Sequence, residues 1–470
     1  MNRKTYQIPS RLQQRITPEQ AFHYRIVPVE ESNEGTRFKT DSESLEQLLS
    51  ELQIVLDAPI VLEPCEKEEL QKYLTSNYRL QARQEGQRIH YTSDFLEKIL
   101  LTARNIGGSD IHFEPFEKQC RVRYRLDGKL LEQYTIPKDE YPTIVNKLKI
   151  QAGLDISEKR LPQDGRISLS TGTAELDIRV SSLPTLHGEK MVLRILSKDT
   201  TAIDLENLGF TIKELQRYQE GIKKPNGIVL ISGPTGSGKT TTLYATLKLL
   251  NRADTNIITI EDPIEYTLEG VNQVQLKENI GLDFASALRT FLRQDPDVIM
   301  VGEIRDVQTA NMAIRAALTG HLVLSTIHTN SSWATISRLI DMGIPSFLIA
   351  STLNMSVAQR LIRKLCDHCK QQEPIDKALF PEHFEIPANL THHYTATGCN
   401  ACHHTGYQGR KALYEILPIT KALLQPVKNN ALEIDDYCTE NHITTLKQNA
   451  VEQIREGATS IAEVYALLTE

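Results

Sequence analysis

The sequence predicts an α/β protein whose largest part is a parallel sheet covered by helices on both faces. From about residue 205 onward, short and almost wholly apolar runs alternate with helical segments, which is typical of buried parallel strands. Before that point, residues 90–203 show a period-two alternation that is typical of an antiparallel sheet. The chain has 470 residues, which corresponds to roughly three domains of ordinary size.

Composition places the chain among globular proteins and argues against a nucleic-acid-binding protein and a membrane-spanning protein. Hydrophobic residues make up 40% of the chain and charged residues 24%. The formal net charge of −7 disfavours nucleic-acid binding, because affinity for phosphate backbones comes mostly from Lys and Arg. No apolar run is long enough to span a bilayer, and the polar segment Met1–Gln20 lacks the apolar core of a signal peptide. We therefore expect a cytosolic protein that reaches a membrane only through partners.

Residues 1–85 are predicted to form a small, mostly helical domain. Within it, Asp41–Leu56 has apolar residues at the spacing of one buried helical face, and Glu66–Leu74 is a second candidate helix. The polar stretch Gln81–Arg88 is predicted to be a linker to the next domain.

Residues 90–203 are predicted to form an α+β domain with an antiparallel sheet. Apolar residues alternate with arginines through Cys120–Leu126, and Asp127-Gly128 follows as a strong hairpin signal. A second hairpin is predicted within Ile167–Ser181, with its turn at Thr171–Thr173. Met191–Leu196 reads as a further strand.

Residues 205–470 are predicted to contain the parallel sheet. Its β-rich runs are Ile228–Ser232, Ile257–Ile260, Val298–Val301 and Leu322–Thr326. A Cys/His-rich insert at 366–409 interrupts this pattern, and residues 411–470 are predicted to be helical, ending in Ile461–Leu468.

A glycine-rich motif between a predicted strand and a predicted helix indicates a phosphate-binding loop. Gly233-Pro-Thr-Gly-Ser-Gly-Lys-Thr240 fits the pattern GxxxxGK[ST], with Thr241–Leu250 following as the helix. Glycines allow backbone N–H groups to surround phosphate oxygens, Lys239 is expected to reach the β- and γ-phosphates, and Thr240 to offer its hydroxyl to Mg²⁺. The expected nucleotide-binding residues are Gly233, Pro234, Thr235, Gly236, Ser237, Gly238, Lys239, Thr240 and Thr241.

Carboxylates follow two of the predicted strands. Glu261, Asp262 and Glu265 come after one strand and would face the nucleotide crevice at the carboxyl edge of the sheet, although solvated strand-end acids explain them equally well. Glu303 follows the strand Val298–Val301 and can hold Mg²⁺ through water or polarise the attacking water. We predict Glu303 and Glu261 as catalytic carboxylates.

Two histidines flank the strand Leu322–Thr326. His328 follows the strand and is predicted to hydrogen-bond the γ-phosphate and to sense its loss. His321 precedes the strand, and the sequence favours neither a functional nor a structural role for it.

Four of the seven cysteines form two CxxC pairs, Cys366/Cys369 and Cys399/Cys402. Paired thiolates of this kind predict a closed, structural zinc site, with His368, His403 and His404 as alternative ligands and a redox pair as the less favoured reading. The remaining cysteines are expected to be structural; they are Cys65, Cys120 and Cys438.

Taken together, these motifs resemble the secretion ATPases of type II secretion and type IV pilus assembly. Leu292–Asp306 resembles the family signature around its Walker B glutamate, Glu261–Glu265 its Asp box and Gly320–Asn330 its His box. Gly108–Pro115 resembles the opening of the family's second N-terminal domain. The four-cysteine module with its long loop is similar to that of the type II secretion ATPase. The resemblance covers residues 90–470 strongly and residues 1–90 weakly.

The resemblance implies a hexameric, RecA-like, cytoplasmic ATPase with a PAS-like second domain. Such a protein would dock on the inner-membrane assembly platform through its N-terminal domain and bind ATP between the antiparallel-sheet domain and the RecA-like domain. The family uses arginines of both domains to stabilise phosphate charge. The matching positions are Arg179, Arg194, Arg289 and Arg293.

The leading hypothesis is a motor ATPase that drives pseudopilus assembly and protein export in type II secretion. The nearest alternative is the same engine in type IV pilus assembly, which the catalytic core cannot discriminate. A nucleic-acid motor is a remote alternative, because the acidic balance and the lack of an aromatic and basic stripe argue against it. A non-hydrolysing zinc adaptor is disfavoured by the intact Lys239, Thr240 and Glu303.

Overall fold

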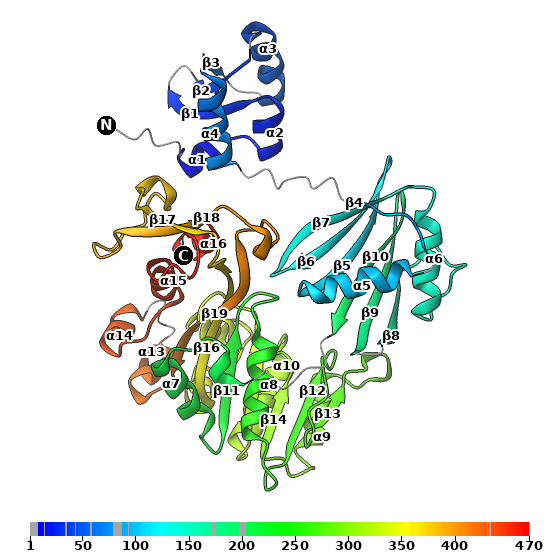
Figure 1. Cartoon of the computed structure of the whole chain (residues 1–470). Coiled ribbons are helices and arrows are strands. Elements are labelled where there is room, and N and C mark those ends of the chain that lie inside the picture. The colour runs from blue at the N-terminus through cyan, green and yellow to red at the C-terminus, as the bar shows by residue number, and fades with distance from the viewer. Residues whose placement is uncertain are drawn as a thin grey trace.

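The computed structural model places the described strands in four sheets (Figure 1). The residues that it describes are 8–13, 15–32, 35–42, 44–56, 59–78, 87–92, 94–171, 174–196, 204–429, 431 and 434–469. Among these residues, no helix combines the length and the apolar character that a membrane span requires.

The N-terminal region combines four helices with a three-stranded sheet, which the expectation of a mostly helical domain did not include. The strands are β1 (Ile26–Ser32), β2 (Gly35–Thr40) and β3 (Ile60–Pro64), and the helices are α1 (Ser10–Gln13), α2 (Pro18–His23), α3 (Leu45–Leu56) and α4 (Lys67–Asn77). Helices α3 and α4 confirm the two predicted helices. The strands escaped prediction because their apolar residues are few or irregular: β2 has one, Phe38, and β1 buries its first three residues and exposes its last three.

The middle region forms a seven-stranded sheet. In spatial order its strands are β4 (Gln87–Arg88), β7 (Lys129–Ile136), β6 (Cys120–Leu126), β5 (Gly108–Pro115), β10 (Gly188–Leu196), β9 (Ala174–Thr185) and β8 (Gln163–Thr171). All neighbours pair antiparallel except β4 and β7, which confirms the predicted type of sheet.

Both predicted hairpins of the middle region are confirmed. Asp127 and Gly128 join β6 to β7 with φ values of 46° and 86°, as a two-residue hairpin turn requires. Strand β8 pairs with β9, although residues 172–173 of the expected turn lie outside the described residues. Gln87 and Arg88 of the predicted linker instead form β4, whereas residues 81–86 also lie outside the described residues.

The two faces of this sheet differ in polarity. Helices α5 (Phe95–Asn105) and α6 (Tyr141–Gln151) cover an apolar face (Figure 1), with Phe95 and Tyr124 fully buried. The opposite face carries ion pairs between neighbouring strands, such as those of Glu114 with Arg121 and Arg123. One of the arginines expected to contact phosphate, Arg194, lies on this charged face and pairs with Asp110.

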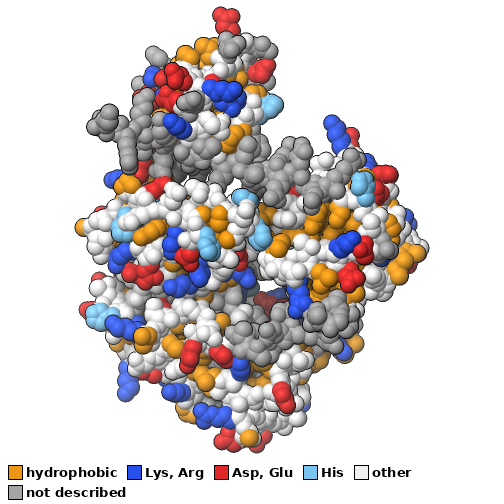
Figure 2. Space-filling model, viewed as in Figure 1, with side chains coloured by type: hydrophobic (Ala, Val, Ile, Leu, Met, Phe, Trp, Pro, Cys, Tyr) orange, Lys and Arg blue, Asp and Glu red, His pale blue; other side chains and the backbone are white. Residues whose placement is uncertain are grey.

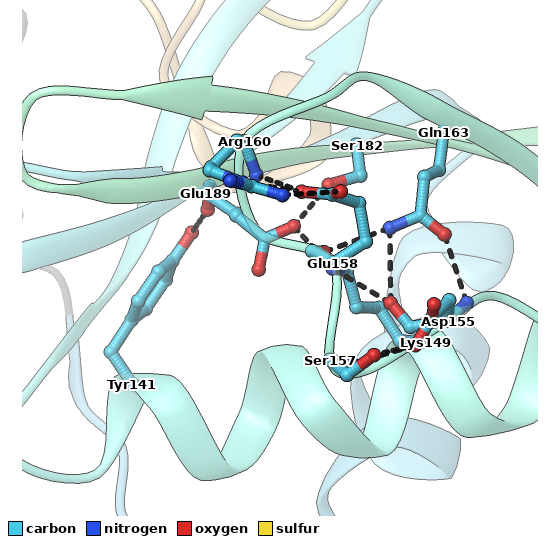
Figure 3. Close-up of polar contacts among 9 residues, drawn as sticks. All are labelled: Tyr141, Lys149, Asp155, Ser157, Glu158, Arg160, Gln163, Ser182 and Glu189. Atoms are coloured by element: carbon cyan, nitrogen blue, oxygen red, sulfur yellow. Dashed lines mark hydrogen bonds and ion pairs between the residues drawn. The ribbon is translucent and has the colours of Figure 1, made fainter.

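A buried ion pair fixes the connection between α6 and β8 (Figure 3). The ammonium of Lys149 is fully buried, lies 2.5 Å from Glu189 and donates to the carbonyl oxygens of Glu158 (2.6 Å) and Asp155 (3.2 Å). Ser182 also donates to Glu189 at 2.8 Å. Removing one member would leave a buried charge unpaired, so this cluster holds the connecting segment against the sheet.

Apolar side chains lie exposed on the same middle region. Ile150, Leu161 and Leu186 are 65%, 61% and 91% exposed. Figure 2 shows hydrophobic side chains gathered over this part of the molecule.

The C-terminal region forms a second seven-stranded sheet, which confirms the predicted parallel strands. In spatial order these are β13 (Asn272–Gln275), β12 (Ile257–Glu261), β14 (Val298–Val301), β15 (Leu322–Ile327), β11 (Gly227–Ser232), β16 (Leu353–Leu365) and β19 (Tyr407–Pro418). All neighbours pair in parallel except β16 and β19. The carboxyl ends of the parallel strands meet at one edge.

Helices cover both faces of this sheet, and alternate residues of each strand pack against them. Ile228 and Leu230 of β11 belong to the core beneath α9 (Phe284–Phe291) and α10 (Val307–Leu318). Val229 and Ile231 belong to the core beneath α7 (Ile212–Ile222) and α8 (Lys239–Leu250). Two further helices, α11 (Ala334–Asp341) and α12 (Ser346–Thr352), border the first of these cores.

The last part of the chain combines a cysteine-rich module, a strand and four helices. A two-stranded sheet of β17 (Lys370–Pro374) and β18 (His392–Ala396) lies between the two CxxC pairs. The helices are α13 (Leu424–Lys428), α14 (Asp435–Glu440), α15 (Leu446–Arg455) and α16 (Ile461–Thr469). The prediction that residues 411–470 are helical is wrong for 411–418, because this apolar run pairs with β16 as part of β19.

Candidate functional site: the phosphate loop and the four-cysteine cluster

The glycine-rich loop connects β11 to α8 at the carboxyl edge of the parallel sheet, in the predicted strand–loop–helix context. Gly233, Gly236 and Gly238 have φ values of 145°, 80° and 88°, which residues with side chains rarely adopt. A Cβ at Gly233 would also lie 2.4 Å from the carbonyl oxygen of Gln359. The glycines are therefore required by the backbone path, which leads into the N-terminus of α8 and its free N–H groups.

Polar groups inside the loop fit an anionic ligand. The ammonium of Lys239 is buried and donates to the carbonyl oxygens of Gly233 (2.9 Å) and Pro234 (3.0 Å). Within the described residues, the buried hydroxyl of Ser237 has no hydrogen-bond partner. Thr240 is exposed at the first turn of α8, and Thr241 is half-buried. A cation and an unsatisfied hydroxyl enclosed by backbone amides are groups that bind phosphate.

Glu303 and His328 lie together at this edge. Gly302 and Glu303 follow β14, and a carboxylate oxygen of Glu303 lies 3.4 Å from Nε2 of His328, which follows β15. Thr326 on β15 donates to the carbonyl oxygen of Gly302 at 2.8 Å and so ties the two strand ends. Arg305 forms an ion pair with the same carboxylate.

The charge of Glu303 acts on Lys239 of the phosphate loop. Burial lowers the pKa of Lys239 below its ordinary value, the charge of Glu303 opposes this shift, and the charge of Arg360 adds to it. The structure therefore gathers Lys239, Glu303 and His328, which the sequence places on three separate strand ends. His321 lies at the other end of β15, about 20 Å away at the usual rise per residue, where its Nδ1 contacts the carbonyl oxygen of Ala316.

Glu261 is held in a polar network beneath α8. It accepts hydrogen bonds from Thr259 (2.5 Å) and Gln273 (3.1 Å), and from the hydroxyl of Tyr244. The residue is 3% exposed, so its carboxylate is engaged by protein donors in this conformation. Asp262 is exposed, and Glu265 is paired with Arg179. The three acids therefore have different surroundings, which their shared position at the carboxyl end of β12 did not predict.

Arg179 and Arg194 both lie on the charged face of the middle sheet, and each is engaged by an acid. Arg179 reaches across to the C-terminal region, where it donates to the carbonyl oxygen of Ile264 (2.6 Å) and pairs with Glu265 (3.2 Å). Arg194 pairs with Asp110 at 3.0 Å. The two residues are direct neighbours in the pairing of β9 and β10.

Arg289 and Arg293 lie elsewhere. Arg289 is in the last turn of α9 and Arg293 follows it, on the segment that enters the amino end of β14, whereas Glu303 follows its carboxyl end. Both side chains are exposed and contact carbonyl oxygens of their own segment. Within this chain the structure does not bring them to the phosphate loop.

Two residues of β16 border the phosphate loop and were missed by the sequence analysis. Gln359 donates to the carbonyl oxygen of Ser237 at 2.9 Å and accepts from Thr242 at 3.0 Å. Arg360 donates to the carbonyl oxygen of Asn330 at 2.7 Å. The only signal in the sequence is a polar Gln-Arg pair inside the apolar run Val357–Ile362, which no motif marks.

The four cysteines of the CxxC pairs form one cluster, with their sulfurs within 4.8 Å of one another. The Sγ–Sγ distances are 3.9 Å for Cys366–Cys399 and for Cys369–Cys402, and 3.8 Å for Cys399–Cys402. A tetrahedral ion bound at about 2.3 Å places its sulfur ligands about 3.8 Å apart, so the four residues fit zinc. None of the alternative ligands His368, His403 and His404 belongs to this cluster within the described residues.

Backbone donors favour the thiolate form of one member of the cluster, Cys402, whereas burial raises the pKa of Cys366 and of Cys369. The N–H groups of Cys399 and Gly406 each lie 3.2 Å from Sγ of Cys402. Although burial raises the pKa of the Cys402 thiol, these hydrogen bonds outweigh it and lower the pKa to about 7. A thiolate is the form that binds metal. Cys65, Cys120 and Cys438 lie outside the cluster.

The fold and the phosphate-loop site together define a P-loop ATPase. Residues 86–466 match the protein family described as "Type II/IV secretion system protein". The chain belongs to this family.

Relatives from two kinds of machinery are similar to the chain to nearly the same degree. The type IV pilus assembly ATPase PilB of Myxococcus xanthus is 48% identical over 372 residues, which is 78% of this chain and 66% of that protein. The type II secretion system ATPase E of Vibrio cholerae is 46% identical over 371 residues, which is 77% of this chain and 73% of that protein. The chain thus spans about two thirds of the length of the first and somewhat more of the second.

A solved structure supports the assignment of the fold. The crystal structure of the pilus retraction motor PilT with bound ADP superposes with a TM-score of 0.51 at 25% identity, covering 78% of this chain and 95% of that one.

Proposed function

We propose that this protein is a cytoplasmic, hexameric motor that hydrolyses ATP to drive pseudopilus assembly and protein export in type II secretion. The observation that carries the proposal is the gathering of Lys239, Glu303 and His328 at one sheet edge, around a loop that is built for phosphate. Phosphoryl transfer to water needs positioned charges more than covalent chemistry, and this site supplies both signs.

Each residue of the site has a defined task in this proposal. Lys239 leaves its carbonyl partners to bind the β- and γ-phosphates, and the loop amides with Ser237 surround the same oxygens. Glu303 orients the attacking water, and His328 binds the γ-phosphate. Thr240 would hold Mg²⁺, which neutralises phosphate charge when it is bound.

Two arginines of the middle sheet are paired with acidic residues in this structure and would change partners when nucleotide binds. Arg179 and Arg194 would exchange Glu265 and Asp110 for phosphate oxygens when the two sheets close on the nucleotide. Glu261 would act from beneath α8 through its network with Tyr244.

The position of Arg289 and Arg293 supports a ring. Arg289 lies in the last turn of α9 and Arg293 follows that helix, near the amino end of β14. Arginines at this end of the sheet would therefore reach a nucleotide in another copy of the chain. A closed ring of identical subunits gives every copy such a neighbour. We assign the N-terminal region, residues 1–85, to docking on the inner-membrane secretion platform, so that membrane association is indirect. No contact with nucleic acid is part of the proposal.

The four-cysteine cluster is assigned to structural zinc. Its four sulfurs come from the protein, which leaves no open position for a substrate, so the bound ion would stabilise the module rather than take part in hydrolysis. The module follows directly on β16, the strand that borders the phosphate loop.

Type IV pilus assembly is the second candidate function, favoured by the pilus relative of M. xanthus at 48% identity. Deletion of the gene in its source organism separates the two readings when secreted proteins and surface pili are both measured. The type II reading expects export to be lost and pili to be retained, and the reverse result would move the motor to pilus assembly. Expression of the wild-type protein in the deletion strain should restore the process that was lost, and expression of the Glu303→Gln variant should not.

A further inference from the structure

His328 and Gln359 occupy equivalent positions on the two strands that neighbour β11, the strand that leads into the phosphate loop. Strand β11 lies between β15 and β16, and its last residue, Ser232, is paired with Ile327 on one side and with Ala358 on the other. His328 and Gln359 are the next residues on these neighbours. They therefore flank Gly233, the first residue of the loop.

The side chain of Arg360 connects the ends of β15 and β16 on the two sides of the loop. Its guanidinium donates to the carbonyl oxygen of Asn330 at 2.7 Å, and a second nitrogen donates to the carbonyl oxygen of Gln359 at 3.2 Å. The same side chain passes 3.4 Å from the position that a Cβ on Gly233 would occupy. Because Asn330 follows β15 and Arg360 belongs to β16, this hydrogen bond crosses the start of the phosphate loop.

Further hydrogen bonds hold the turn that contains His328. Thr329 contacts Thr335 at 2.9 Å, and Ser332 donates to the buried carboxylate of Glu415 at 2.8 Å through its N–H. The Arg360 bond fixes the segment between these points at Asn330, two residues after His328. His328 itself is half-exposed, and its contact with Glu303 is 3.4 Å, so the path of the backbone decides where its ring lies.

We propose that Arg360 is a positioning residue, which holds the His328 turn across the phosphate loop and so sets the position of the His328 ring relative to Lys239 and Glu303. The inference rests on the proposed role of His328 and names a residue outside the recognised motifs. Arg360 uses a planar fork for two carbonyl oxygens, which lysine cannot reproduce with a single ammonium group.

The test is a double-mutant cycle in the full-length chain. ATP hydrolysis is measured for the wild-type protein, Arg360→Ala, His328→Ala and the double variant. We expect Arg360→Ala to lower kcat by about tenfold and to change KM less than about threefold, because the residue acts on the position of His328. In the His328→Ala background the same substitution should cost less than about twofold. Arg360→Lys should retain part of the lost kcat.

A matched control lies three residues further along β16. Arg363 pairs with Glu463 and lies over the ring of Tyr407, away from the phosphate loop. Arg363→Ala should lower the melting temperature, and any loss of kcat should be the same with or without His328. This control separates a general weakening of β16 from the specific connection to His328.

Three results would overturn the inference: equal losses of kcat in both backgrounds, a loss confined to KM, or full activity in Arg360→Ala. If Arg360→Ala does not fold, the cycle is run with Arg360→Lys and Arg360→Gln. If His328→Ala has no measurable turnover, hydrogen exchange decides: the amides of residues 328–331 should exchange faster in the Arg360 variants and not in Arg363→Ala. A wild-type protein without turnover would refute the proposed function, whereas the exchange measurement would still test the connection.

Discussion

The phosphate loop and the four-cysteine cluster follow neighbouring strands of one sheet, yet they are completed in different ways. The loop follows β11, and its buried Ser237 hydroxyl has no partner among the residues that the structure describes, while Thr240 is exposed. The cluster follows β16, and its four sulfurs already lie at the spacing of a tetrahedron. The first site is therefore arranged to exchange its ligand, and the second to keep it.

The origin of the two sites differs as well. The phosphate loop, Glu303 and His328 follow the ends of β11, β14 and β15, so they come together only in the folded chain. The cluster requires a single long-range contact, between two CxxC pairs that are each local in the sequence. Substitutions in the first should change chemistry without unfolding, and substitutions in the second should act through local structure.

The largest effect is expected from Lys239→Ala and Glu303→Gln, which should each reduce ATP turnover below detection. Lys239 bonds only to carbonyl oxygens of its own loop, so the melting temperature should change little. Steady-state hydrolysis by purified protein is the measurement. Lys248→Ala is the control, because this exposed lysine on the same helix pairs with Asp204 rather than with the phosphate loop. Hydrolysis at the wild-type rate by Glu303→Gln would remove Glu303 from the mechanism.

The next effect is expected from replacing Cys366 and Cys399 together by serine. The double variant should lose its bound zinc, because two thiolates cannot close the tetrahedral site. Metal analysis, export and ATP hydrolysis are measured on the same variants. Export should fall by more than tenfold, whereas hydrolysis should stay within about threefold, and Cys438→Ser should leave both unchanged. Equal loss of export and hydrolysis would mean that the module merely maintains the fold that both sites share.

An intermediate effect is expected at the contact between the two large sheets. Arg179→Gln and Arg194→Gln should each lower kcat about tenfold, which corresponds to about 1.4 kcal/mol of transition-state stabilisation. Arg160→Gln is the control, because its side chain is 89% exposed and pairs with Glu158 of the same segment. A change in melting temperature without a change in kcat would assign Arg179 to domain contact alone.

The smallest effect is expected at Glu114, which lies on the charged face of the middle sheet and pairs with Arg121 and Arg123. Burial alone would raise its pKa, but hydrogen bonds from Arg123, Arg121 and Lys190 lower the pKa from 4.5 to about 2. The charged form is thus favoured in the folded state, so its stabilisation is present above about pH 4.5 and is lost as the pH falls toward 2.

Glu114→Gln tests this expectation. The variant should be less stable than the wild-type protein by about 1 kcal/mol at pH 7, since the cationic partners are partly exposed and screened by solvent. The difference should shrink between pH 5 and pH 2 in denaturant titrations. A difference that does not depend on pH would show that side-chain packing, and not charge, stabilises this position.

Some elements were predictable because their signals are local. The hairpin at Asp127-Gly128 is fixed by two residues that accept positive φ, and the strand–loop–helix around Lys239 is fixed by its glycines. The three N-terminal strands and the strand at 411–418 were missed. Their apolar residues favour a strand only when a neighbouring strand or helix packs against them, as β16 pairs with β19.

The sequence by itself determined the phosphate loop, the order of the parallel strands along the chain, the four thiol ligands and the family. These features depend on residue types at short spacings, where backbone conformation and ligand chemistry are local. Only the tertiary structure decided which strand ends are neighbours. It paired His328 with Glu303, placed Arg179 against Glu265, enclosed Glu261 under α8 and brought Gln359 and Arg360 to the phosphate loop. The physical reason is that spatial strand order follows from burying both faces of the sheet at once, which no short stretch of sequence encodes.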